Sequence, residues 1–197
     1  MGVNMKPMLY YRIMAKILKT GADWDKLAPA EENAIEYAHN VLNDEPVRET
    51  NGIYSLEYCL AHSGETINKR YRDQKYMDEI DLQIPDMLNQ YSTKAPIVVY
   101  RGVDDEIYQM MIDAARHSKG VDLKEKAFLA TSFVKGHEIN TKIKLRIYLP
   151  AGTHAVYMGD VNYEEKTNYE VTVQYDAELK IISIDKEYIN CLLLKTA

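Results

Sequence analysis

Hydrophobic positions in the first part of the chain recur at intervals of three and four, which is the spacing of one face of an α-helix. Two further helices are expected around residues 55–62 and 65–79. The first half of the chain is therefore expected to be helical. The spacing is clearest in two groups of residues, namely Met8, Tyr11, Ile13, Ile17 and Leu18, and then Ala34, Tyr37, Ala38, Val41 and Leu42.

After residues 92–96 the pattern changes to short runs of branched and aromatic residues, which are typical of β-strands. The run 142–149 alternates, so that Ile143 and Leu145 lie on the opposite face from Lys144 and Arg146. One helix is expected near residues 105–117. The pattern predicts an α+β fold with a mostly antiparallel β core. The runs lie at residues 97–100, 127–130, 142–149, 155–157, 169–173 and 179–184.

Composition narrows the classes of function. A chain of 197 residues, 46% of them hydrophobic, is long enough for one buried core. The formal net charge of -6 disfavours nucleic acid and anionic membranes as partners, and no stretch approaches the length of a membrane span. Cys59 and Cys191 lie far apart without neighbouring cysteine or histidine, so neither a metal site nor a disulfide framework is indicated.

Three short motifs carry candidate chemistry. Arg101 follows an apolar strand and precedes Gly102, so it can aim a guanidinium group at a phosphate, although such arginines often pair with a carboxylate. Thr131 and Ser132 end the second motif, which is also a common polar end of a strand.

The third motif opens the strand at residues 169–173. Asn168 and Glu170 are expected to point to the same side of it, because strand side chains repeat every two residues. A single glutamate at such a position is commonly a solvated surface residue, which remains the alternative interpretation.

Taken together and in order, the three motifs resemble the arginine, serine and glutamate motifs of ADP-ribosyltransferase exoenzymes, the branch with clostridial C3-like enzymes and binary-toxin enzymatic components. Residues 66–72 are similar to the family's I-N-x-x-L-R helix, residues 99–102 to its V-Y-R-G strand and residues 128–132 to its F-x-S-T-S motif. Residues 145–157 are similar to its strand and turn L-R-x-x-V-P-x-G-[ST]-x-A-x-Y. The resemblance extends over residues 53–184. It implies a single domain, with a helical part at 1–92 and a catalytic core of two sheets at 93–197.

The resemblance also implies roles for individual residues. Glu170 would stabilise the positive charge that develops on ribose when the nicotinamide bond of NAD breaks. Arg101 would bind a phosphate or the nicotinamide ribose, and Gly102 would offer its backbone to the nicotinamide amide. Asn68 and Arg72 would reach the pyrophosphate, although a salt bridge is an equal alternative for Arg72.

Further residues complete the implied site. Thr131 and Ser132 would support the glutamate and the NAD ribose. Tyr163 lies where relatives have an aromatic that touches the protein substrate, although an ordinary loop tyrosine is an equal alternative. Asn168 stands where relatives have Glu or Gln. NAD is the expected co-substrate, and no metal is expected.

The sequence departs from the family pattern at two further points. Ala130 replaces the first serine of S-T-S, so that Thr131 or Ser132 would have to orient the glutamate. The loop at residues 134–141 lacks the aromatic that stacks on nicotinamide, and Phe133 and His137 are the nearby rings.

The leading hypothesis is an NAD-dependent mono-ADP-ribosyltransferase, a glycosyl-transferring enzyme that modifies a target protein of unknown identity. An NAD glycohydrolase on the same fold and a non-catalytic binding module are the alternatives. The expected location is the cytoplasm, either where the chain is made or after delivery into a target cell, with a separate delivery component as one route.

Overall fold

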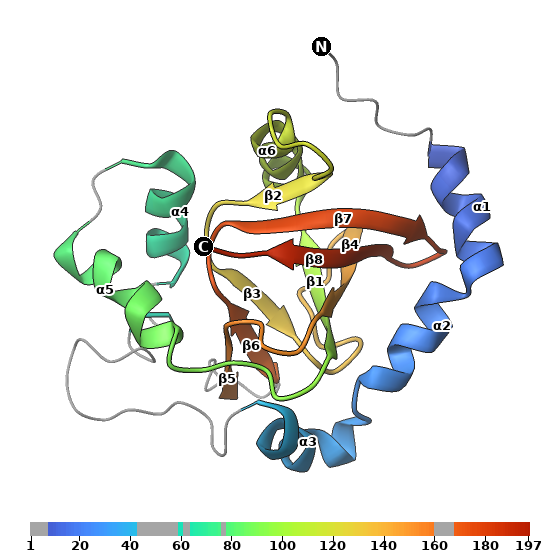
Figure 1. Ribbon diagram of the computed structural model, residues 1–197, viewed down its shortest axis with the longest axis horizontal. Helices are drawn as coiled ribbons and strands as arrows, with labels where there is room; N and C mark the ends of the chain where they lie inside the picture. Colours follow the sequence, from blue (N-terminus) through green and yellow to red (C-terminus); the bar gives the residue numbers. More distant parts are fainter. Residues whose placement is uncertain (1–7, 43–58, 61–63, 76–77, 160–167) are drawn as a thin grey trace.

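The computed structural model describes residues 8–42, 59–60, 64–75, 78–159 and 168–197. Helices come first and strands follow, as the hydrophobic pattern predicts (Figure 1). The helices are α1 (Met8–Leu18), α2 (Thr20–Trp24), α3 (Ala34–Val41), α4 (Gly64–Asp73), α5 (Glu79–Leu88) and α6 (Asp105–Ala115), with short 3-10 turns η1 (Asp25–Leu27) and η2 (Glu31–Asn33).

The strands form a mixed, mostly antiparallel sheet of eight strands in the order β2-β7-β8-β4-β1-β3-β6-β5, in which β4 and β8 are the parallel pair. The α+β class is thus confirmed. The strands are β1 (Ile97–Val103), β2 (Leu123–Glu125), β3 (Leu129–Ser132), β4 (Ile143–Leu149), β5 (Ala155–Gly159), β6 (Glu170–Val173), β7 (Ala177–Ile184) and β8 (Ile189–Lys195).

The two separate sheets implied by the resemblance are not found, because the pairing runs without a break through all eight strands. The two halves nevertheless meet at a narrow junction. β1 pairs with β4 from Ile97 to Val103, but it pairs with β3 only at Tyr100, which faces Ser132. Beyond this single pair β1 and β3 make no further ladder contact.

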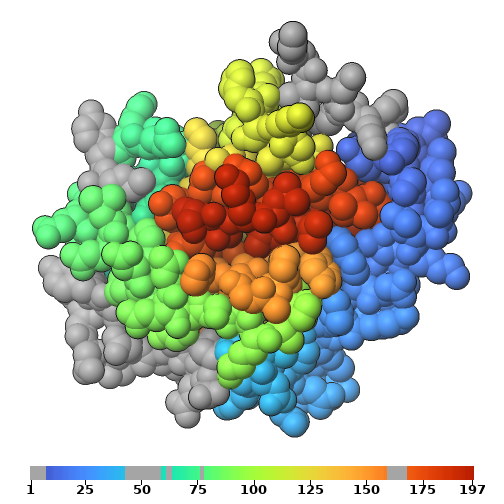
Figure 2. All heavy atoms as spheres, in the orientation of Figure 1, coloured from blue at the N-terminus to red at the C-terminus, as the bar shows by residue number. Residues whose placement is uncertain are grey.

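Three apolar clusters hold the elements together. The largest includes Val99 of β1 and Leu129 of β3, and α1 contributes Tyr11 to it. A second cluster joins α4 and α5 to Phe128, and a third places Tyr100 near Tyr188 beside the N-terminal helices. Figure 2 shows β7 and β8 at the surface, with the N-terminal helices on one side and α4 and α5 on the other.

Several boundaries differ from the sequence prediction. The helix expected at residues 65–79 ends at Asp73, where Gln74 takes a positive φ of 53°, and α5 begins after Asp78, whose side chain forms a capping box with Asp81. The sequence pattern missed β2, which has three residues, and β8, which lacks alternation because it lies between β7 and β4. The helix expected at residues 55–62 falls mostly outside the described residues.

The polar face of β4 is also partly covered. Arg146, expected on the face opposite Leu145, is buried with only 2% of its surface exposed. Asp25 of η1 lies against it, with Oδ1 2.7 Å from Nε. The N-terminal helices therefore cover a part of the sheet that carries charge, and an acidic side chain compensates for it.

Candidate functional site

Strand order brings the three sequence motifs together. Arg101 lies on β1, Ser132 on β3 and Glu170 on β6, and these three strands are consecutive in the sheet. Ser132 faces Tyr100 on one side and Glu170 on the other. The motifs are far apart in sequence, and the ladder places them at one region of the sheet.

Glu170 is the first residue of β6 and is partly buried. Its Oε1 accepts a hydrogen bond of 2.9 Å from the hydroxyl of Thr172. Burial raises the pKa of the Glu170 carboxyl above its ordinary value, while the Thr172 hydrogen bond and the charge of Arg101 act against that rise. The carboxyl group therefore lies in an environment that weakens its acidity.

The Arg101 guanidinium makes two hydrogen bonds to the described residues. Its Nη1 donates to the carbonyl of Ala130 at 3.0 Å and its Nη2 donates to Glu125 at 3.2 Å. Its Nε is buried and has no acceptor in the described part of the chain. Burial lowers the pKa of the Arg101 guanidinium, an effect that Glu125 and Glu170 oppose.

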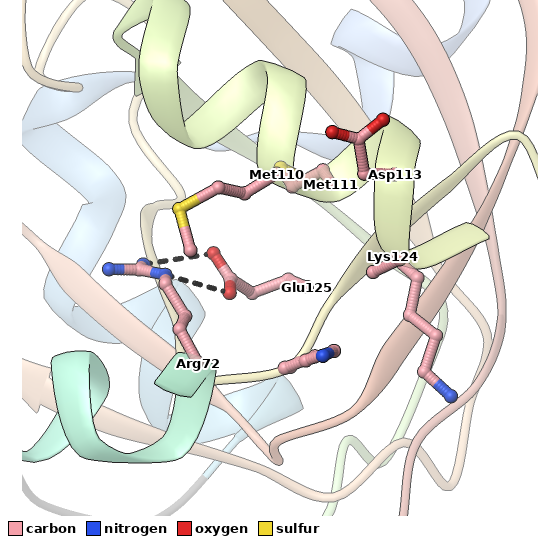
Figure 3. A pocket seen from close by; sticks show the side chains of 8 residues that line it. Arg72, Met110, Met111, Asp113, Lys124 and Glu125 are labelled. Atoms are coloured by element: carbon pink, nitrogen blue, oxygen red, sulfur yellow. Dashed lines mark hydrogen bonds and ion pairs between the residues drawn. The ribbon is translucent and has the colours of Figure 1, made fainter. Parts of the chain in front are cut away.

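Glu125 is the residue that the sequence motifs missed. It is 1% exposed, and its two oxygens accept hydrogen bonds of 3.0 Å each from Nε and Nη2 of Arg72 (Figure 3). The backbone N–H of Ala127 donates to it as well, at 3.0 Å. Burial acts to raise the pKa of Glu125, but Arg101 and Arg72 outweigh it and hold that pKa below the ordinary value.

A pocket of about 260 Å³ opens beside this ion pair. Figure 3 shows Arg72 reaching from α4 toward Glu125, with Met110 and Met111 of α6 across from them. The remaining lining residues are Asp113, Ala114, Lys124 and Lys126. The salt bridge that the sequence left as an alternative for Arg72 is present, and it leads to a carboxylate that Arg101 also contacts.

The other predicted polar residues are tied to the backbone. Asn68 accepts a hydrogen bond from the N–H of Phe128 at 3.1 Å through its side-chain oxygen. The Thr131 hydroxyl donates to the carbonyl of Val171 at 2.6 Å. The Ser132 hydroxyl donates to the carbonyl of Val134 and accepts from the N–H of the same residue. Neither hydroxyl has a hydrogen bond to Glu170.

Gly102 is in close contact with another part of the chain. A Cβ atom at this position would lie 1.8 Å from the carbonyl oxygen of Ile139 and 2.8 Å from the Thr141 hydroxyl. Any larger residue would therefore clash with the backbone. The segment around Ile139 lies where a ligand approaching the Gly102 backbone would need room.

The remaining candidates differ in how far the structure describes them. β6 begins at Glu170, and Tyr169 has a positive φ of 46°, so the alternation rule does not extend back to Asn168. Tyr163 lies outside the described residues. Phe133 is fully buried among core rings, and His137 lies 3.4 Å from Glu31 and packs against Tyr169. Phe133 therefore belongs to the core and is not exposed to a ligand.

Two negative findings apply to the described residues. No cluster of three or more histidine, cysteine, aspartate or glutamate side chains with the geometry of a metal site occurs among them. No helix in this part of the chain is long and apolar enough to cross a membrane.

The fold is similar to that of bacterial ADP-ribosyltransferase toxins. Plx2a from Paenibacillus larvae is 16% identical, with 94% of this chain and 98% of that chain covered and a TM-score of 0.56. C3stau2 from S. aureus, solved with NAD, is 18% identical over 92% of this chain and 95% of its own, with a TM-score of 0.53.

A further structural neighbour is a longer chain than this one. The toxin BECa of a C. perfringens binary enterotoxin, solved with NADH, is 16% identical, with 90% of this chain and 48% of that chain covered and a TM-score of 0.51. No curated protein is significantly similar in sequence to this chain. The family model described as ADP-ribosyltransferase exoenzyme matches residues 50–193. The chain therefore belongs to the ADP-ribosyltransferase exoenzyme family, as its motifs indicate.

Proposed function

We propose that this protein is a mono-ADP-ribosyltransferase that cleaves the nicotinamide–ribose bond of NAD and transfers ADP-ribose to a side chain of a target protein. The observation that carries the proposal is the arrangement of Arg101 and Glu170 on strands that flank β3. A cation for the diphosphate and a carboxylate for the ribose are the two charges that this reaction needs. We further propose that residues 1–92 and 93–197 act together as one catalytic domain.

Arg101 and Arg72 would bind the diphosphate of NAD. Both guanidinium groups contact Glu125, which is one carboxylate shared between two cations, so the cluster has positive charge to spare for an anion. Glu125 would act as a positioning residue, because it fixes the orientation of both guanidinium groups without touching the reacting atoms. Asn68, held to the backbone of Phe128, would contribute its amide N–H groups on the same side.

Glu170 would stabilise the transition state. When the bond between ribose C1′ and the nicotinamide nitrogen breaks, its electron pair leaves with nicotinamide and C1′ becomes electron-deficient. An ionised Glu170 would stabilise this charge and bind a ribose hydroxyl, and Ser132, which faces Glu170 across the ladder, would line the ribose from β3. Thr131 points to the opposite face and would support this region through its hydrogen bond to the carbonyl of Val171. The acceptor side chain would then bond to C1′ and lose its proton. Asn168 and Tyr163 would lie toward the protein acceptor.

Nicotinamide would need the space beside Gly102. The carbonyl of Ile139 occupies that space. We therefore expect the segment at residues 139–141 to move when NAD binds, so that the Gly102 backbone can meet the nicotinamide amide.

The experiment is to incubate the protein with NAD labelled on its adenylate half and a cell lysate. Label on a discrete protein band is expected, and Glu170→Gln should abolish it with a smaller effect on NAD binding. Glu106→Gln, an exposed glutamate on α6, is the matched control and should label normally. Absence of any label on protein, with NAD unchanged, would overturn the proposal.

A glycohydrolase is the second candidate, and Ala130 favours it. Loss of the serine hydroxyl beside the glutamate leaves more room for water as the acceptor. Free ADP-ribose without a labelled band would support this reaction. Consumption of NAD by either reaction, transfer to protein or hydrolysis, would exclude a non-catalytic binding module.

The similarity to toxins supports a proposal for the site of action. BECa belongs to a binary enterotoxin, and we propose that this chain likewise acts in the cytoplasm of a target cell or of the cell that makes it. A separate delivery component would serve the first route.

A further inference from the structure

The residue that contacts Glu170 most directly lies outside the motifs singled out in the sequence. Thr172 is 2% exposed, and its hydroxyl donates to Glu170 Oε1 at 2.9 Å. Across the ladder between β3 and β6, Thr172 faces Ala130. The position that lacks a hydroxyl on β3 thus lies opposite a threonine on β6.

We propose that Thr172 is the positioning residue of Glu170, and that it supplies from β6 the hydroxyl that Ala130 cannot supply from β3. The inference rests on the proposed function for its consequence in catalysis. Its structural content, a hydrogen bond that fixes one carboxylate oxygen, does not depend on that function.

The register explains why the two positions are interchangeable. Residues paired across an antiparallel ladder point to the same face, so positions 130 and 172 share a face with Glu170 and its partner Ser132. A residue diagonal to Glu170 lies about 7 Å away between Cα atoms, within reach of a long side chain. A serine at position 130 would therefore extend its hydroxyl toward the same carboxylate.

The alternative donors on β3 are already used. Thr131 donates to the carbonyl of Val171, and Ser132 exchanges hydrogen bonds with Val134. Thr131 also points to the face opposite Glu170, and Ser132 cannot turn to Glu170 without giving up its hydrogen bonds with the backbone of Val134. The Thr172 hydroxyl makes no other hydrogen bond among the described residues, so orienting Glu170 is the contact that it makes.

The hydrogen bond has an electrostatic consequence. Burial raises the pKa of Glu170, and donation from Thr172 acts in the opposite direction because it stabilises the charged form. Without the hydroxyl, the pKa of Glu170 would rise further, and less of the carboxylate would be ionised at a given pH.

The test is Thr172→Val, which keeps the shape and removes the hydroxyl. Titration of the Glu170 carboxyl by ¹³C NMR should show a higher pKa than in the wild type. In NAD cleavage, kcat should fall about tenfold with little change in KM, and the rise of activity with pH should move to higher pH. Adding Ala130→Ser to this variant should restore both the titration and kcat.

Thr93→Val is the matched control. Thr93 is also 2% exposed and donates to the carbonyl of Pro150, so its loss should lower stability without moving the Glu170 titration. An unchanged Glu170 titration in Thr172→Val would overturn the inference, as would a loss of kcat that Ala130→Ser does not rescue. If the titration moves as expected while no variant cleaves NAD, the positioning contact is supported and the proposed function fails.

Discussion

Two adjacent residues of β1 enter two ionic clusters that differ in their balance of charge. Arg101 meets Glu125 at 3.2 Å in the cluster that also holds Arg72. Tyr100 donates to Asp25 at 2.8 Å in a cluster centred on Arg146. Successive strand residues point to opposite sides, so one strand supplies both.

The positive charges in the cluster around Arg146 are compensated by carboxylates. Arg146 lies between Asp25 at 2.7 Å and Asp185 at 2.6 Å, and Lys135 binds Asp25 as well. Lys135 also pairs with Glu187 at 3.3 Å, so three carboxylates compensate the two cations, and the cluster joins η1, β4 and the segment after β3. It has the character of a structural support.

The cluster around Glu125, by contrast, has an excess of positive charge. One carboxylate serves two guanidinium groups, and a pocket adjoins them. A buried Nε without a hydrogen-bond acceptor among the described residues occurs on both Arg101 and Arg146, so it does not distinguish the two clusters. A buried cation without full compensation is costly unless a ligand supplies the missing charge. The two clusters differ in their balance of charge and not in burial alone, and excess positive charge is the feature that our proposal assigns to binding.

Removing the shared carboxylate should have the largest effect. Glu125→Gln leaves two nearly buried guanidinium groups without their counter-charge, and we expect a loss of about 3–5 kcal/mol in the free energy of unfolding. The pKa of Glu125 is lowered in the folded state, so this contribution is present above the ordinary value of 4.5 and is lost as pH falls. Urea unfolding at pH 7 and at acid pH measures both.

An anion should compensate for the same change. Addition of inorganic pyrophosphate should recover part of the stability of Glu125→Gln and stabilise the wild type less. A variant as stable as the wild type at pH 7, with no response to pyrophosphate, would show that the Glu125 cluster does not bind an anion.

The sequence singled out some residues of the candidate site and not others. Arg101 and Glu170 were proposed from short motifs taken in order, because a strand end followed by glycine and a glutamate at a strand start are local features. Glu125 was missed, since a three-residue strand gives little pattern and its importance comes from partners on α4 and β1. The helix-then-strand order was read correctly, but the parallel pair β4 and β8 depends on contacts that no local pattern encodes.

Ala130 gives a second lesson. The sequence predicted that Thr131 or Ser132 would replace the missing hydroxyl, because they are neighbours along the chain. The hydrogen bond to Glu170 comes instead from Thr172, which is a neighbour across the ladder. Compensation of this kind depends on strand register, which the motifs did not fix.

Exchanging arginine for lysine in each cluster should separate binding from support. Arg101→Lys removes a planar donor that can meet two phosphate oxygens, and we expect NAD affinity to fall about 10–100-fold. Arg146→Lys should lower the thermal midpoint and leave NAD affinity near that of the wild type. Calorimetric titration with NAD and thermal unfolding of both variants provide the measurements; equal losses of affinity would contradict the distinction.

Neutralising Asp25 should have a smaller effect. Asp25 is about a third exposed on its side chain, so water can replace part of its contact with Arg146. We expect Asp25→Asn to cost about 1–2 kcal/mol in the free energy of unfolding, well below the cost of Glu125→Gln. Chemical unfolding of both variants under one set of conditions tests the order, and a larger loss for Asp25→Asn would reverse the comparison.

The smallest effect should have the opposite sign, and it concerns Glu170. Its pKa is raised in the folded state, so the ionised carboxylate costs stability once pH exceeds that raised value, whereas below the ordinary 4.5 the group is protonated in both states. Glu170→Gln should therefore unfold at a higher temperature than the wild type at neutral pH, and the gap should close on acidification. Glu125→Gln should be less stable at neutral pH. If the two glutamine variants shift the thermal midpoint in the same direction at pH 7, the two carboxylates do not occupy opposite electrostatic environments.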